Sequence, residues 1–345
     1  MTEYLDELQE GMDVLFPEYE IQVQELFERM LQGDILSCLT ELMRQTIAKL
    51  SADAVGLKNL FIWLILLGIA SALLSHVVEL FDAHQVADLG FYFVYLSMIA
   101  VMLRCFLDSA EIAGQALESI VLFGKLLVPV YLIAVGAATG SISAAAYYQL
   151  FLILIYGVEK ILLGVGLPLC YAFCMLNVIN GIWPEEKLSL FIDLVKKCID
   201  WLIKGAIGIV TGVSVFQSLL NPVLDAFRSG GMQKAMTAIP GMGNAAEGVL
   251  ELAVGSAVVI KNSVGVVLLF GLLLLCVNPL LKILLTALVI KLSAALMGMV
   301  SDKRITLAAN RAGDAALCLL RTTATGFFLF FISLAVSTLA TNRGF

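Results

Sequence analysis

Charged side chains that stand inside long apolar runs are the residues of this sequence best placed to do chemistry. They are Glu159, Lys160, Lys261, Lys282 and Lys291. A charge at membrane depth is costly, so by default it indicates an ion path, a substrate site or a buried pair. The alternative is that Lys160, Lys261 and Lys282 lie near helix ends and extend to the lipid headgroups. These charges are therefore candidates for either a conduit or helix packing.

Lys291 is the strongest of these candidates. Its flanking sequences, TALVI and LSAAL, place no membrane interface nearby. Lys282 lies nine residues earlier, about half a turn around a helix, so the two lysines cannot face one pore. Adjacent Glu159 and Lys160 point about 100° apart on one helix and do not share a face. We expect Lys291 to need a compensating partner or a wet path.

The segment 238–244 breaks helical structure by its composition. Pro240, Gly241 and Gly243 give it an irregular backbone. Such a backbone near a membrane is tolerated where it lines a wet cavity or is covered by protein. An ordinary loop outside the membrane is the alternative.

Motifs of enzymes and cofactor sites are absent from the sequence. The two histidines, His76 and His84, form no His-Glu-x-x-His pair, and no Gly-x-Ser-Gly or phosphate-binding Gly-x-x-x-x-Gly-Lys loop occurs. The seven cysteines form no Cys-x-x-Cys pair and mostly stand in apolar runs, as buried small hydrophobes do. We expect a protein that is not an enzyme and binds no cofactor or metal, with any energy supplied by a partner or a gradient.

Composition and hydrophobic runs place the chain in a membrane. It is 60% hydrophobic and 14% charged, with a mean hydropathy of +0.96, whereas soluble domains carry about 25% charged residues. Runs of about 20 apolar residues match the hydrocarbon core of a bilayer. The prediction is an all-α, polytopic helical membrane protein of seven or eight spans, drawn from 59–78, 90–107, 120–139, 147–182, 205–220, 264–278, 280–299 and 322–340. The shorter run 245–260 is interpreted as a re-entrant or interfacial piece.

The N-terminal segment differs from the rest. Residues 1–58 hold 12 acidic against 4 basic side chains, and the apolar positions from Ile21 follow a helical period. The first residues show neither the basic nor the apolar region of a signal peptide. We predict an acidic, amphipathic helical segment at 1–56 outside the bilayer, and a multipass domain at 57–345.

Two amphipathic stretches, 185–204 and 302–321, precede predicted spans. The first has Lys196 and Lys197 on its polar face and Trp201 at headgroup level, as in interfacial helices. Each stretch carries four basic residues, which favours the cytoplasmic side for both. With an offset of 101 residues, the region from Gly140 aligns faintly with the region from Gly241, so an internal duplication is a hypothesis.

One block carries a specific resemblance. It contains the IPG-x-G turn at 239–243, VIKNSVGVV at 259–267, PLLK before KLSAAL, and SDKRI at 301–305. This block resembles the stage III sporulation protein AE family of endospore-forming bacteria, with weaker similarity reaching back to about residue 57. The resemblance implies a multipass component of the mother-cell membrane around the forespore. It also implies a place in the channel built by stage III sporulation A proteins, including the AA ATPase, with forespore stage II sporulation protein Q, and it brings no catalytic residues.

Three function classes follow. The leading one is a non-enzymatic membrane subunit of a sporulation transport channel. For this subunit, homo-oligomers are one option, and no nucleic-acid partner is expected. A stand-alone secondary transporter would need a midplane site, for which Lys291 and 238–244 are the hints. A membrane scaffold would recruit partners through 1–56 and 185–204.

Overall fold

The described part of the chain is built of helices, several of them very long. The structure is a computed structural model and describes residues 9, 10, 13, 15, 35–81, 84–139, 153–182, 187–236 and 243–340. No strand occurs among these residues. The elements are α3 (Ile35–Phe81), α4 (His84–Thr139), helical residues 153–161, the π-helical turn η1 (Leu162–Gly166), α6 (Leu167–Asn180), α7 (Ser189–Met236), α8 (Gly243–Met297) and α9 (Lys303–Ala340). The predicted all-α class is confirmed.

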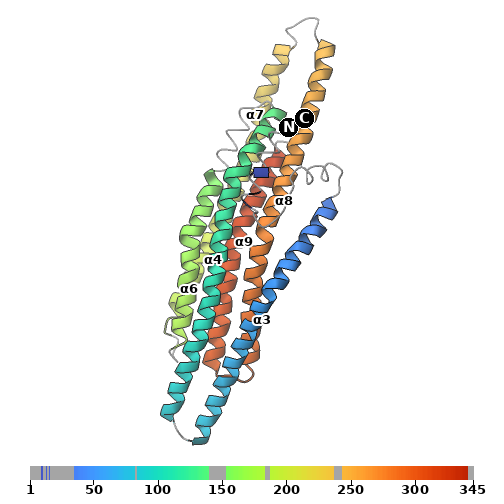
Figure 1. The fold of residues 1–345 in the computed structure, drawn as a ribbon. Helices are drawn as coiled ribbons and strands as arrows, with labels where there is room; N and C mark the ends of the chain where they lie inside the picture. Colours follow the sequence, from blue (N-terminus) through green and yellow to red (C-terminus); the bar gives the residue numbers. More distant parts are fainter. Residues whose placement is uncertain are drawn as a thin grey trace.

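The helices form an elongated bundle around the hairpin of α8 and α9 (Figure 1). α4 packs along both members of this hairpin, and α3 covers α4 and α8. α6 and α7 pack on the other side, against α9. The end of α6 and the start of α7 lie at the same end of the bundle as the end of α8 and the start of α9, toward the lower end in Figure 1. The first residues of α7 and α9 therefore lie on one side, although the cytoplasmic location of that side stays a prediction.

Several predicted spans are joined into one helix each. Residues 90–107 and 120–139 both belong to α4. Residues 264–278 and 280–297 both belong to α8, which passes through Pro279 and ends two residues before the predicted run does. A membrane helix can keep a proline because neighbouring helices satisfy the freed backbone groups. Asn278-Pro279 is therefore not a boundary between two helices.

The joining of predicted runs also bears on the number of spans. Within the described residues, five stretches are long and apolar enough to cross a membrane, so a count of seven or eight is not confirmed. The five are Val55–Leu73, Gly90–Leu126, Ile153–Asn180, Gly265–Met297 and Lys303–Ala335. α3 also continues through residue 56, where the sequence predicts a change of domain; that domain boundary remains a prediction.

The segment 302–321 is a core helix rather than a separate interfacial one. Its alanines 308, 309, 312, 315 and 316 are at most 4% exposed, and the helix continues without a break into the last predicted span. Small residues let helix backbones approach closely, which is how helices associate in lipid. The small residues of this stretch therefore form a packing face within the bundle.

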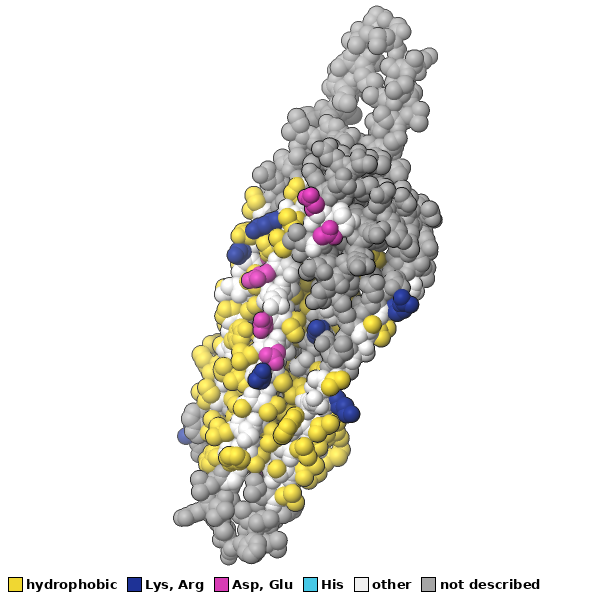
Figure 2. Space-filling model, viewed as in Figure 1, with side chains coloured by type: hydrophobic (Ala, Val, Ile, Leu, Met, Phe, Trp, Pro, Cys, Tyr) yellow, Lys and Arg dark blue, Asp and Glu magenta, His cyan; other side chains and the backbone are white. Residues whose placement is uncertain are grey.

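The outer surface of the bundle is apolar. Large hydrophobic side chains are more than half exposed on several helices, including Trp63, Phe93, Ile153, Leu190 and Phe328. Figure 2 shows hydrophobic side chains covering much of the lower part of the visible face. Since the same helices are long enough to span a bilayer, this surface fits contact with lipid tails. The protein is a membrane protein.

Candidate functional site

Lys291 lies in a polar cluster between α8 and α9. Its Nζ donates hydrogen bonds to Oδ1 of Asn310 at 2.9 Å and to Oδ1 of Asp314 at 2.7 Å. The lysine and aspartate side chains are 27% and 42% exposed, so the cluster is at the edge of the core rather than sealed inside it. The charge that stands mid-span in the sequence therefore has an ionic partner in the fold.

The local sequence of α9 explains this arrangement. Asn310 and Asp314 are four residues apart and share one helix face. Between them, Gly313 leaves room for the lysine stem, because a Cβ on Gly313 would lie only 2.8 Å from Cγ of Lys291. Asn310, Gly313 and Asp314 were not among the residues that the sequence singled out. The signal was a polar pair at helical spacing within an alanine-rich stretch.

Glu159 occupies a second, separate position in the bundle. It lies in the helical residues 153–161, its side chain is fully buried, and neither carboxyl oxygen has a hydrogen-bond partner. Both oxygens lie against Gly326 of α9, where a Cβ would stand 2.9 and 3.0 Å from them. Gly326 is twelve residues beyond Asp314, which is about 18 Å along a helix. Glu159 and Lys291 therefore belong to different sites.

The remaining predicted residues are more peripheral. Lys160 is exposed and its Nζ lies 5.7 Å from the centre of the Tyr156 ring. Lys196, Lys197 and Trp201 are exposed on α7, whose interfacial placement stays a prediction. Gly243 is the first residue of α8, Lys261 lies within α8 with its side chain outside the described set, and Pro240 and Gly241 lie outside the described residues.

One face of the predicted interfacial helix points into the bundle. Ile192, Val195 and Ile199 of α7 are at most 7% exposed, whereas Leu190 and Trp201 on other faces are more than 70% exposed. The apolar residues of this stretch therefore divide between a face that packs on the bundle and a face that is open. The stripe through Val195 and Ile199 is a core contact, not a lipid-facing surface.

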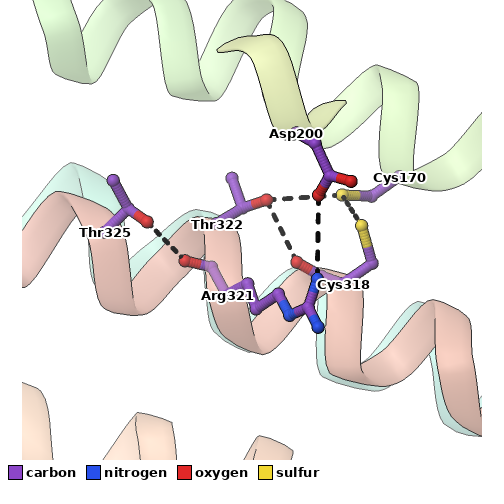
Figure 3. Close-up of polar contacts among 6 residues, drawn as sticks. All are labelled: Cys170, Asp200, Cys318, Arg321, Thr322 and Thr325. Carbon is purple, nitrogen blue, oxygen red and sulfur yellow. Dashed lines mark hydrogen bonds and ion pairs between the residues drawn. The ribbon is translucent and has the colours of Figure 1, made fainter. Parts of the chain in front are cut away.

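A third polar group joins α6, α7 and α9 (Figure 3). Sγ of Cys170 lies 3.6 Å from Sγ of Cys318 and 3.5 Å from Oγ1 of Thr322. Beside them, Arg321 of α9 forms an ion pair with Asp200 of α7 at 3.7 Å. Among the described residues, no three histidine, cysteine or acidic side chains are grouped as metal ligands would be. The group ties three helices together.

The two thiols supply a direct test of this packing. We expect a membrane-permeant copper(II)–phenanthroline oxidant to join Cys170 and Cys318, because their sulfurs need to close only from 3.6 Å to the S–S bond length of about 2.05 Å. The two thiols lose two protons, and their two electrons reduce copper(II). Peptide mass spectrometry of the non-reduced protein should find the linked pair, and Cys170→Ser should abolish it. Linkage of either thiol to the exposed Cys198 instead would contradict the α6–α9 contact.

Comparison with known proteins covers nearly the whole chain. A family model described as stage III sporulation protein AE matches residues 21–341. Among curated proteins, stage III sporulation protein AE of Bacillus subtilis (strain 168) is 22% identical over 281 residues, which are 81% of this chain and 70% of that protein. No solved structure matches the chain. The region matched by the family model includes the Lys291 cluster, Glu159 and the thiol pair.

Proposed function

Because the chain belongs to the stage III sporulation protein AE family, we propose that it is a non-enzymatic integral membrane subunit of a transport channel between mother cell and forespore. Its proposed place is the mother-cell membrane around the forespore. The match to the family model from residue 21 to residue 341 includes the five stretches of the described residues that are long and apolar enough to cross a membrane. The family relationship therefore concerns the membrane bundle itself rather than a single appended module.

The partners are part of the same proposal. They are the other stage III sporulation A proteins, including the AA ATPase, and the forespore stage II sporulation protein Q. The sequence has no phosphate-binding loop of its own, so a subunit role with an external energy source fits the chain better than an independent pump.

The observation that carries the transport role is the Lys291 cluster. Lys291, Asn310 and Asp314 form an ionic hydrogen-bond network between two membrane-spanning helices. Charged groups within spans are retained mainly where they serve an ion or substrate path, or where they fix helix packing. Of these two uses, a path for an ion or substrate is the one that distinguishes a transport subunit from a scaffold that recruits partners through its ends.

Reconstitution tests the proposal against its two alternatives. The purified full-length protein in liposomes should conduct no solute by itself. Solute should cross only when the protein is co-reconstituted with its stage III sporulation A partners. Uptake by the protein alone would establish a stand-alone transporter and overturn the subunit role. If the partners conducted solute fully without this protein, its role would be that of a scaffold.

A further inference from the structure

Glu159 is a carboxyl group without the partners that buried acids usually have. Its side chain is 0% exposed, and both oxygens lack hydrogen-bond partners. Across the bundle, its neighbours are Leu117 of α4 and Gly326 of α9. A Cβ on Gly326 would contact both the Leu117 side chain and the two carboxyl oxygens. An ionised carboxylate in such surroundings would bear the full cost of desolvation.

Charged groups on the surrounding helices do not neutralise Glu159. The next residue, Lys160, is exposed and lies over the ring of Tyr156, and Lys125 of α4 lies over the same ring at 5.5 Å. Arg321, on α9, is paired with a carboxylate of α7. Within the described residues, no basic group forms an ion pair with Glu159, so nothing in this part of the chain compensates a negative charge on it.

A metal cation is a poor candidate for a ligand of Glu159. Hard cations bind through six or more oxygen ligands, whereas Glu159 offers two oxygens next to a glycine and a leucine. The hydroxyl groups of Thr322, Thr323 and Thr325, which precede Gly326 on α9, already donate to backbone carbonyls of their own helix. A proton needs no such coordination shell.

An apolar cavity of about 340 Å³ lies one helical turn away. Its lining includes Ile120, Ile155 and Phe330, which are three or four residues from Leu117, Glu159 and Gly326 on their helices. The cavity also reaches Ile153 and Lys125, which are exposed. It therefore extends from the outer surface of the bundle toward the carboxyl group, along the junction of the same three helical segments.

We propose that Glu159 is a proton-binding site within the membrane-spanning bundle, and that it carries its proton at neutral pH. The cavity gives a small apolar reagent an approach to it. This inference does not depend on the channel role, because it rests on the burial and the neighbours of one side chain.

The test is modification by dicyclohexylcarbodiimide, an apolar reagent that adds to protonated carboxyl groups. The carboxyl proton passes to one nitrogen of the carbodiimide, and a carboxyl oxygen bonds the central carbon of the reagent. The acyl group then migrates to a nitrogen of the reagent and gives a stable N-acylurea, with no leaving group released. Full-length protein in its own membranes should be modified at Glu159 at neutral pH, and more slowly as the pH is raised. Glu111 and Glu118, exposed on α4, are the comparison carboxyl groups and should be modified by the same reagent more slowly at neutral pH.

The variant Glu159→Gln supplies a second measurement that does not depend on reagent access. It should match the wild type in thermal unfolding midpoint below about pH 4, where the carboxyl group of the wild type is neutral in both the folded and the unfolded state. As the pH is raised toward neutral, the wild type should fall below the variant, since its carboxyl group ionises in the unfolded chain while the folded protein keeps the proton. A lower midpoint for the variant at neutral pH would overturn the proposal, as would modification no faster than at Glu111. Protection by sodium but not potassium would replace the proton by a metal cation.

Discussion

Replacing Lys291 with Met should impair sporulation while the protein still accumulates in the membrane. The substitution removes the cation that Asp314 contacts at 2.7 Å and leaves that carboxylate unpaired. An unpaired Asp at the centre of a membrane helix costs about 2.5–3.5 kcal/mol on insertion scales. Because Asp314 is 42% exposed, water offsets part of this, and we expect a loss of about 1–2 kcal/mol from the α8–α9 contact. Spore yield and membrane levels of the variant, measured in the host organism, give the result.

Matched variants separate the use of the charge from its packing. Lys291→Arg keeps a cation beside Asp314 and should be the mildest change. Lys291→Met combined with Asp314→Leu removes both charges, so it should restore much of the thermal stability lost by the single variant. If the ionic network serves transport, this double variant should be stable and still defective in sporulation. Normal spore yield from the double variant would show that the pair only holds the helices together, and would remove the main support for a transport role.

The sequence predicted the class of the protein well because composition and hydropathy are sums over many residues. Long apolar runs require helices in a bilayer, whatever their neighbours are. Lys291 was singled out as a charge within an apolar run, since that depends only on the residues on either side, but α8 ends six residues later, at Met297. The sequence could not name Asp314 as its partner, because that contact depends on how α8 and α9 align in the hairpin.

The ends of helices were harder to predict for a related reason. Asn278-Pro279 has the composition of a break, yet α8 continues through it, since packing in the bundle outweighs a local preference. The stretch 302–321 has polar residues at helical spacing, as a surface helix has. Its alanines, however, form a buried face, and the polar residues Asn310 and Asp314 contact Lys291. Hydropathy alone does not distinguish a helix face of small residues that packs in the core from a weakly apolar face that lies at the surface.

Gly326→Leu should be among the most destabilising single substitutions in the bundle. A Cβ at Gly326 would stand 2.5 Å from a methyl carbon of Leu117 and within 3.0 Å of both oxygens of Glu159, so even the first added atom requires movement on two neighbouring elements. Overpacking of this kind costs about 1–3 kcal/mol. We expect a lower unfolding midpoint in detergent and less protein in the membrane.

Gly208→Leu is the matched control, because a Cβ at this exposed position of α7 meets nothing within 4 Å. It should leave the midpoint unchanged or slightly raised, since replacing a helical glycine removes a cost of about 0.5–1 kcal/mol. Adding Glu159→Ala to Gly326→Leu should recover part of the lost stability, because it vacates the space that the leucine needs. Equal midpoints for the variants at 326 and 208 would show that α9 does not approach Glu159 this closely. Recovery by Glu159→Ala would instead demonstrate the contact directly, because two distant positions have no reason to compensate each other.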